Sequence, residues 1–428
     1  MRLPELIGKE FRELAASRAW WLVLLMIGPL VGHAFITAVD SYAEASAPGA
    51  LAQGLSPLDG ILVPTFGAYD IAVTLLFPFV AIRLVSSEKE SGALKLMLQS
   101  PAALPTMLLA KGIALIAGWA VAGIPGLIAL ALWKSYDGTL YAPEVANLLL
   151  GHLLRVVVAA GIAVAAAAIA KTAASAAIAT LGFTVGTWAL EFIAEGRGGW
   201  LHTLAAYTPT AALRSFEQGL LRMNTALVMS IVGIAGFALA AAWLRETRWR
   251  WARCAGVMAA GFVMLGLASL PRASWDLSEN RRNSFSPSEE AALRQIRQPL
   301  RVTANLAPED PRLADLVRNV LSKLERILDR VEIDYSARTR SGLFEGDRYG
   351  EVWYEGGSQK TMLRSTTEPI VLETIFKLAG IAPPAADDHE SYRGHPLAAR
   401  PAGAAWIYYF VWPIVVFAGA LLEFRKRS

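Results

Sequence analysis

The sequence predicts an α-helical polytopic membrane protein with eight spans and a small extracytoplasmic α/β domain between the seventh and eighth spans. The mean hydropathy is +0.41 and 54% of the residues are hydrophobic, which is too apolar for a soluble globular domain. Eight apolar stretches have about the length of a membrane span. More than half of the charged residues fall within residues 271–400, which make up under a third of the chain.

Each span is predicted from roughly 20 apolar residues, the length of helix that crosses a bilayer core. Seven segments meet this length cleanly, and the fourth is less regular because it is rich in alanine and carries His152 and Arg155. The eight predicted spans are residues 20–39, 61–82, 112–133, 148–170, 172–190, 226–244, 254–270 and 401–422. The single cysteine, Cys254, excludes a disulfide framework and a cysteine-based metal site.

The distribution of Lys and Arg predicts the orientation of the spans. With eight spans and both termini in the cytoplasm, the inner segments hold sixteen Lys and Arg and the short outer loops hold four, as the positive-inside rule requires. Omitting the fourth span would place the basic segment 245–253 outside. The same parity places residues 271–400 outside the cytoplasm, where a long translocated domain is exempt from the rule.

Residues 1–19 are predicted to form an amphipathic helix in the membrane interface. Leu3, Ile7, Phe11 and Leu14 recur at helical spacing, with charged residues between them. Lys111, at the inner end of the third span, is interpreted as an anchor at the lipid headgroups.

The polar segment after the second span, SSEKESGALKLMLQSP (residues 86–101), predicts a short cytoplasmic helix. This helix is expected to begin in the cluster Glu88-Lys89-Glu90 and to end before Pro101. Leu94, Met97 and Leu98 of this helix fall on one face, at i, i+3 and i+4. A solvated loop that anchors the span is the alternative, and composition alone favours that alternative.

The same segment resembles the signature loop of type-2 ABC exporter permeases. That loop has an acidic-basic-acidic cluster, a glycine, a leucine-rich turn, Ser-Pro and then a lysine that opens the third span. The resemblance implies that residues 88–100 form a coupling helix, which docks into a groove on a separate ATPase. The residues implicated in ATPase coupling are Glu88, Lys89, Glu90, Gly92, Leu94, Lys95, Leu98, Ser100 and Pro101. Ala93 and Lys95 depart from the family pattern, which usually has Thr and Glu at these positions.

The layout of residues 1–244 resembles the same family, with an interfacial helix, a six-span permease domain (residues 20–244) and a long last outer loop, residues 191–225. In this family such loops form short re-entrant helices, which implies that role for Tyr207, Pro209 and Phe216. No G-x-x-x-x-G-K-[ST] phosphate loop occurs, so the chain is expected to be neither an enzyme nor the holder of a cofactor. ATP and Mg²⁺ are expected on a partner, a cytoplasmic ABC ATPase subunit. The chain is expected to form a homodimer or to pair with a second permease.

The remaining residues predict an added part: a cytoplasmic loop and seventh span (245–270), an α/β domain (271–400), and the eighth span with a basic cytoplasmic tail (401–428). In the domain, Ser286 and Glu289 form a capping box that opens a helix, and Gly356-Gly357 is predicted as a hairpin turn. Strands are predicted at 300–306, 331–335, 350–354 and 360–363, and further helices at 311–328 and 368–378.

The blocks DLSENRRNSFSPSEEAAL, LRVTANL, RYGEVWYEGG and TTEPIVLETIFKLAG resemble the auxiliary subunit of gliding-motility (Gld) type ABC systems. The chain thus resembles a fusion of a permease with a shortened auxiliary domain. The resemblance implies no catalytic activity.

Ionisable residues inside the spans are candidates for a transport pathway, because charge is costly in the bilayer. Asp70, Arg155 and His33 are the candidates. Asp70 and Arg155 lie at matching depths, and either a paired interaction or separate snorkelling toward the outer interface fits that placement. His389 and His395 lie in the loop 383–400, which is interpreted as a solvated linker, so no metal site is predicted.

Together, the residues and the resemblance predict the permease subunit of an ATP-binding cassette exporter in a bacterial inner membrane, with an envelope-related substrate. The alternative is a mechanical or scaffolding subunit, whose outer domain recruits or remodels an envelope partner without substrate passage. Membrane lipids and an extracytoplasmic protein are expected partners, and nucleic acid is not.

Overall fold

The computed structural model describes residues 3–47, 54–98, 104–194, 200–245, 248–307, 310–328, 330–335, 348–384 and 392–426. The chain forms two compact units, and each is described by itself. The first unit comprises residues 1–188, 209–273 and 392–428, and the second comprises residues 189–208 and 274–391.

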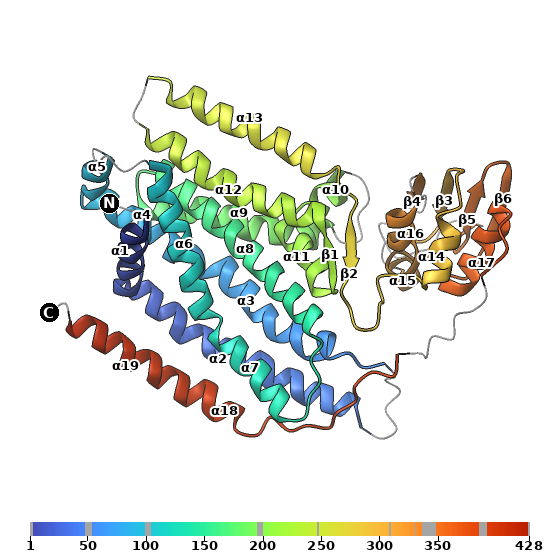
Figure 1. Cartoon of the computed structure of the whole chain (residues 1–428), viewed down its shortest axis with the longest axis horizontal. Coiled ribbons are helices and arrows are strands. Elements are labelled where there is room, and N and C mark those ends of the chain that lie inside the picture. Colours follow the sequence, from blue (N-terminus) through green and yellow to red (C-terminus); the bar gives the residue numbers. More distant parts are fainter. Residues whose placement is uncertain are drawn as a thin grey trace. The chain divides into compact units, whose positions relative to one another are not determined.

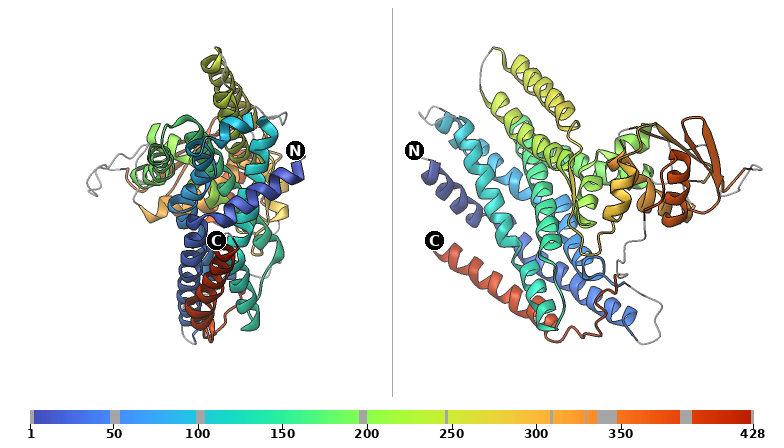
Figure 2. Two further views of the ribbon diagram at one scale, coloured as in Figure 1. Left: turned by 90° about the vertical axis from the view of Figure 1, so that its left-hand side faces the viewer. Right: turned by 45° about the vertical axis from the view of Figure 1, so that its right-hand side comes forward.

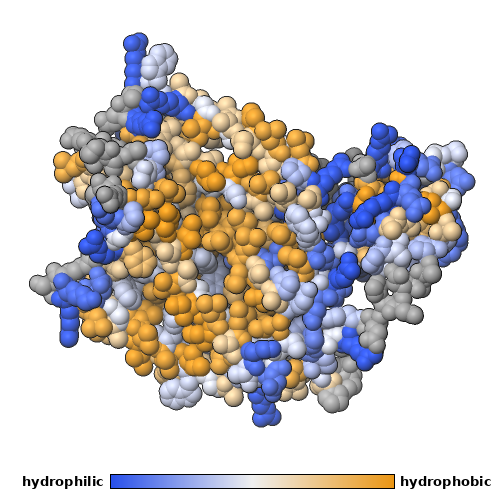
Figure 3. Space-filling view, in the orientation of Figure 1, coloured by the Kyte–Doolittle hydropathy of each residue, from blue (hydrophilic) through white to orange (hydrophobic). Residues whose placement is uncertain are grey.

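The described part of the chain contains eight helical segments that are long and apolar enough to cross a membrane, which confirms the predicted number of spans. They are Arg18–Ala45 (α2), Leu58–Glu90 (a π-helical turn, α3 and α4), Leu104–Ser135 (α6 and α7), Ala142–Ile169 (α8), Ala173–Ala194 (α9), Met223–Leu244 (α12), Arg250–Ala268 (α13) and Ala404–Arg425 (α18, a π-helical turn and α19). Figures 1 and 2 show the first unit as a bundle of these helices. Apolar side chains cover the face of the bundle shown in Figure 3, as a lipid-facing surface requires.

Two spans are divided at prolines. The second span breaks at Leu76, between α3 (Val63–Leu75) and α4 (Phe77–Glu90), and Pro78 opens α4. Because a proline clashes with the carbonyl four residues before it, Pro78 frees the carbonyl of Thr74, which accepts a hydrogen bond from Thr184 Oγ1 at 3.0 Å. The third span breaks in the same way at Pro125, between α6 (Leu104–Ala122) and α7 (Ile124–Ser135).

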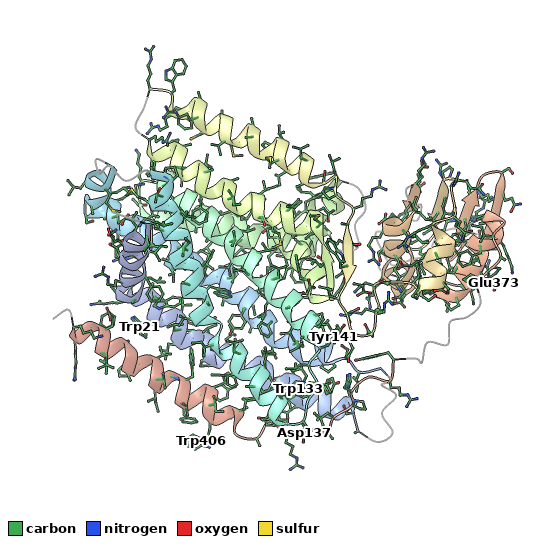
Figure 4. All side chains as sticks on the ribbon, in the orientation of Figure 1. Trp21, Trp133, Asp137, Tyr141, Glu373 and Trp406 are labelled. Atoms are coloured by element: carbon green, nitrogen blue, oxygen red, sulfur yellow. The ribbon has the colours of Figure 1, made fainter. Side chains whose placement is uncertain are left out.

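Aromatic side chains mark both ends of the bundle. Trp21 lies near the start of α2, whereas Trp133 and Tyr141 lie at the opposite end, where α7 turns into α8 (Figure 4). The turn is closed by a hydrogen bond from Trp133 Nε1 to the carbonyl of Thr139, at 2.9 Å. Tryptophan and tyrosine are enriched at the two membrane–water interfaces, so their placement fits a membrane-spanning bundle.

The alanine-rich helix α8 lies at the centre of the first unit, which explains its composition. It crosses α12 at Gly161, where an added Cβ atom would lie 2.1 Å from the carbonyl oxygen of Gly233. The two backbones therefore touch, as small residues allow in membrane helices. The fourth span was the least regular of the eight predicted spans, and the structure confirms that it is a membrane-length helix.

Helix α1 (Leu3–Ala16) confirms the predicted N-terminal helix but corrects its buried face. Leu6, Glu10 and Leu14 are buried, whereas Phe11, predicted on the apolar stripe, is 40% exposed. Of the predicted stripe, Leu14 is buried and Leu3 and Ile7 are partly buried, so the correction concerns Phe11 alone. The neighbouring Glu10 is buried because its carboxylate reaches the buried Lys111.

The predicted outer loop contains two short helices, α10 (Trp200–Ala206) and α11 (Pro209–Glu217), and then strand β1 (Leu220–Arg222). In the first unit, Phe216 of α11 is fully buried and packs near Val158 of α8 and Met229 of α12. Asn147 Nδ2 donates to the carbonyl of Phe216 at 2.8 Å, so α11 is fixed near the start of α8. Tyr207 is exposed.

The second unit contains a four-stranded sheet in the order β4-β3-β5-β6. Its strands are β3 (Leu300–Ala304), β4 (Val331–Tyr335), β5 (Val352–Gly356) and β6 (Gln359–Leu363), with β2 (Ser274–Asp276) outside this sheet. Strand β3 pairs in parallel with β4, with Leu300 opposite Val331, and antiparallel with β5. The hairpin of β5 and β6 turns at Gly357, whose φ of +60° favours glycine, so the predicted hairpin is confirmed.

The described helices between residues 274 and 391 also follow the predicted local signals. They are α14 (Pro287–Leu293), α15 (Pro311–Leu316), a π-helical turn (Val317–Leu321), α16 (Ser322–Ile327) and α17 (Glu368–Ala379). The capping box forms, with Ser286 Oγ accepting from the backbone N–H of Glu289. Phe285, Leu316, Val320 and Tyr354 are buried in one core shared by sheet and helices.

Residues 392–403 correct the predicted solvated linker. The backbone N–H of His395 donates to the carbonyl of Leu55 at 2.8 Å, and Tyr42 Oη donates to the carbonyl of His395 at 2.8 Å. Both partners belong to the first unit, near the end of α2, so this stretch is packed. His389 lies outside the described residues.

Candidate coupling site

The predicted coupling segment is divided between two helices rather than forming one. Glu88, Lys89 and Glu90 are the last residues of α4, and the separate helix α5 (Ala93–Leu98) follows. Gly92, with a φ of +75°, makes the break between them, because this left-handed backbone conformation ends a helix. Ser100 and Pro101 lie outside the described residues, as do the side chains of Lys95 and Leu98.

Glu88 faces the interior of the first unit, where it joins a buried cluster of charges. Its carboxylate accepts a hydrogen bond from Lys9 Nζ of α1 at 2.6 Å, and it forms an ion pair with Lys111 Nζ of α6 at 2.9 Å. Lys111 also donates to Glu10 of α1 at 2.6 Å and to the carbonyl of Leu84 at 3.2 Å. Glu88 and Lys111 are 4% and 2% exposed. Three helices, α1, α4 and α6, are therefore joined by buried charge.

The predicted role of Lys111 as an exposed headgroup anchor is wrong for this reason. Its ammonium is enclosed between two carboxylates, and such a group is retained in a protein interior only when it is paired. We define the charge cluster as Lys9, Glu10, Glu13, Glu88 and Lys111.

The environment of the cluster shifts the pKa values of Glu10 and Lys9. Burial raises the pKa of Glu10, and Lys111 opposes this shift by Coulombic attraction and a hydrogen bond. For Lys9, burial works to lower the pKa, but its hydrogen bond to Glu88 and the nearby carboxylates outweigh burial and raise it. Lys9 is therefore held in its charged form.

Three carboxylates of the charge cluster, those of Glu10, Glu13 and Glu88, lie within 4.8 Å of one another, close enough to share a cation. The two lysines supply that positive charge. Lys9 Nζ lies 3.1 Å from Glu13 and 3.2 Å from Glu10, in addition to its bond to Glu88. The arrangement is thus a lysine–carboxylate network.

Lys89 points to a different helix. Its ammonium donates to the carbonyls of Ala167, Ala168 and Ala170, at 3.0, 3.0 and 2.6 Å. These carbonyls lie in the last turn of α8 and just after it. The last carbonyls of a helix have no backbone N–H group of the same helix to donate to them. A cation there also interacts favourably with the helix dipole. Lys89 therefore caps α8 and fixes it to α4.

Among the described residues of the segment, Glu90 and Leu96 are exposed and differ in chemistry. Glu90 is exposed at the end of α4, and Leu96 of α5 is 71% exposed, although it is apolar. Leu94, two residues earlier, is 7% exposed and packs into the main core of the first unit. Helix α5 is therefore seated by Leu94 and presents Leu96 outward.

Comparison with known proteins identifies the family of the chain. A sequence model described as ABC-2 family transporter protein matches residues 5–240, more than half of the chain. The chain belongs to this family. Members of this family are multi-pass transmembrane subunits of ABC transporters. They generally work with a cytoplasmic ATPase and are not themselves that ATPase. No curated protein and no solved structure matches the chain.

The family match begins within α1, covers the first five spans and most of the sixth, α12, and ends before α13. It therefore includes the charge cluster and the coupling segment, whereas residues 241–428 are outside it. The predicted likeness of the second unit to a Gld-type auxiliary subunit has no support from the match.

The candidate pathway residues lie deeper in the permease. Arg155 Nε donates to Asp70 Oδ1 at 2.9 Å, and Arg155 Nη2 donates to Thr74 Oγ1 at 3.0 Å. Of the two predicted arrangements, the structure has the paired one rather than separate snorkelling. Arg155 is fully buried within the first unit, so the pair joins α3 to α8. His33 is exposed on α2. A role of these residues in a pathway stays a prediction.

Sequence reasoning missed the partners of Glu88 because they are far along the chain. Lys9 is 79 residues away from it. One signal was available. The N-terminal helix and the start of the third span were both expected at the cytoplasmic interface, and they carry opposite charges at Glu10 and Lys111.

Proposed function

We propose that this chain is the permease subunit of an ABC exporter and that residues 88–98 receive the motion of the ATPase. The observation that carries the proposal is the division of labour within one motif. Glu88 and Lys89 are bound inside the permease, to α1, α6 and α8, whereas Glu90 and Leu96 face outward.

The geometry suggests how a displacement is transmitted. A partner that contacts Leu96 and Glu90 pushes on α5 and on the end of α4. Because Glu88 and Lys89 tie that end to three other helices, the displacement passes to the N-terminal helix α1 and to the third and fourth spans together. Buried ionic contacts suit this task, since their partners cannot separate without a large cost in free energy.

The partners follow from this proposal. Two ATPase chains would bind ATP and Mg²⁺, and a second copy of this chain or a related permease would form the other half of the transporter. The orientation predicted from Lys and Arg places both termini and α5 in the cytoplasm and residues 271–400 outside it, in a bacterial inner membrane. An envelope-related substrate and a Gld-type origin of the second unit rest on sequence resemblance alone.

Co-purification with the partner ATPase tests the proposal. Leu96→Ser should reduce ATPase binding, because it removes the exposed apolar contact, whereas Phe11→Ser changes an exposed apolar residue on α1 and is the matched control. Lys89→Met should leave ATPase binding intact but reduce transport per ATP hydrolysed. Wild-type ATPase binding by both Leu96→Ser and Glu90→Arg would contradict the proposal.

A scaffolding function is the second candidate, and the second unit favours it. This unit has its own buried core and a sheet of four strands, more than a connection between two spans requires. Replacing residues 274–391 with a short flexible linker separates the two functions. Loss of the cellular phenotype, with substrate transport and ATPase activity retained in vesicles, would favour scaffolding. Loss of transport would favour export.

A further inference from the structure

The seventh span is held to the rest of the first unit along a narrow line. Within the described residues, α13 makes its extended contact with α12 alone, and the two helices run side by side (Figures 1 and 2). Cys254 and Ala268 are its buried residues, while Phe262, Val263 and Met264 are exposed. A helix with so little protein contact leaves a space beside its line of contact.

That space is a groove of about 580 Å³, within the ~300–1,000 Å³ typical of small-molecule sites. Its walls come from α12 and α13, with one residue from the start of α6. Small residues line most of its length, among them Ala238, Ala241, Gly256 and Ala260. They follow helical spacing on each helix, so the groove runs along the helix axes as a hydrocarbon chain would.

Two arginines stand at one end of the groove. Arg245 follows the last residue of α12, and Arg253 lies in the first turn of α13, so both are at the connection between these helices. Both are exposed, and the described residues that line the groove include no carboxylate. The first turn of α13 adds the positive end of its helix dipole.

The surroundings place this end of the groove at the level of lipid headgroups. Trp249 and Trp251, in the connection and the first turn of α13, are 67% and 69% exposed. Arg250 stacks over the ring of Trp243, with its guanidinium carbon 4.5 Å from the ring centroid. Exposed tryptophans with arginines are typical of the membrane–water interface.

We propose that this groove binds one anionic phospholipid, with its phosphate between Arg245 and Arg253 and an acyl chain along the alanine and glycine residues. The occupant is inferred from charge and shape together, because two guanidinium groups match a phosphate and the floor is apolar. The bound lipid fills the space beside α13 and fixes the seventh span to the six-span bundle. Its assignment to the inner leaflet rests on the proposed orientation of the permease.

Native mass spectrometry of the full chain in mild detergent tests this site. Phosphatidylglycerol is titrated and compared with phosphatidylcholine of the same acyl chains and with glycerol phosphate, which lacks them. Arg245→Gln combined with Arg253→Gln should weaken phosphatidylglycerol binding about 30-fold, from ~1 kcal/mol for each basic residue near an anionic lipid. The control, Arg248→Gln combined with Arg250→Gln, removes two charges from the same connection but none from the groove, and should bind as wild type.

Ala260→Phe tests the acyl-chain part of the site, because it fills the groove without changing its charge. It should also release phosphatidylglycerol, while glycerol phosphate should bind none of the proteins tightly. Equal loss in both double variants would overturn the proposal in favour of a general basic surface. The proposal would also be overturned if phosphatidylcholine bound as tightly as phosphatidylglycerol, or if Ala260→Phe bound phosphatidylglycerol as wild type does. It would be overturned too if the groove were found to hold a protein chain instead of a lipid. Coupling to the ATPase is measured separately, so failure here leaves the proposed function standing.

Discussion

Neutralising Glu88 while keeping its shape isolates the energetic role of the charge cluster. In Glu88→Gln, Lys111 keeps its partner Glu10 at 2.6 Å, but Lys9 loses its closest carboxylate and Lys111 loses its second. Breaking a buried ion pair costs ~3–5 kcal/mol. The glutamine keeps one acceptor and Lys9 is 26% exposed, so water replaces part of the loss. We therefore expect a cost of about 2–3 kcal/mol, below that range.

The cost should appear where α1 separates from α4 and α6, and hydrogen exchange of the backbone amides of α1 measures it in the full-length protein. With opening and closing faster than exchange, 2–3 kcal/mol corresponds to about 30- to 150-fold faster exchange at these amides. The matched control is Glu90→Gln, two residues further on and exposed, for which about twofold or less is expected. Equal exchange in the two variants, or an unchanged α1 in Glu88→Gln, would refute the reasoning.

Three further predictions concern other contacts of the two units. Lys89→Met removes the cation from the last carbonyls of α8, which should lower the free energy of local opening there by about 1–3 kcal/mol. Hydrogen exchange of the backbone amides at the end of α8 should be correspondingly faster. Gly161→Ala forces a Cβ atom against Gly233, so the midpoint of thermal unfolding should fall with about 1–3 kcal/mol of lost stability, whereas Gly182→Ala, with open space around it, should not. A hydrogen bond from Arg312 lowers the pKa of Asp310 from its ordinary 3.8 to about 2, although burial opposes this shift. The hydroxyl of Tyr349 donates a further hydrogen bond that also lowers the pKa. Because the folded pKa is depressed, the stabilisation is present above pH 3.8 and is lost as the pH falls toward 2; exchange in the second unit should show this loss, and Asp310→Asn should not.

The eight spans could be predicted because each depends on local composition. Twenty apolar residues form a helix in a membrane wherever their neighbours lie, since the backbone must satisfy its own hydrogen bonds there. The alanine-rich fourth span was the hardest to predict for a related reason. Its many small residues are explained by close contact with α12 at Gly161, which is a tertiary property.

The second unit divides along the same line. The capping box at Ser286 and the hairpin at Gly357 are signals within a few residues, and both were predicted. The sheet order was not predictable, because the parallel pairing of Leu300 with Val331 and the antiparallel pairing of β3 with β5 join residues far apart in the chain. Nothing local in β3 specifies which strand lies on which side.

The face of α1 shows how a local rule can mislead. Counting apolar residues at helical spacing favoured burial of Phe11 and exposure of Glu10, and the structure has the reverse. The rule assumes that charge faces water. It fails here because Lys111, about a hundred residues away, supplies the opposite charge inside the bundle, and a buried carboxylate is tolerated when it is paired.

The acidic-basic-acidic cluster acquires a different meaning from its helical phase. Successive residues of an α-helix, with 3.6 residues per turn, point about 100° apart. Glu88, Lys89 and Glu90 therefore cannot all face one partner while they remain helical, and they do remain in α4 up to its last residue. One faces α1 and α6, the next caps α8, and the third is exposed. A motif that reads as a single charged surface thus works as three separate contacts, and only the third is available to an ATPase. Gly92 then ends α4 with a left-handed backbone conformation, and the short helix α5 that follows presents Leu96 to the surface.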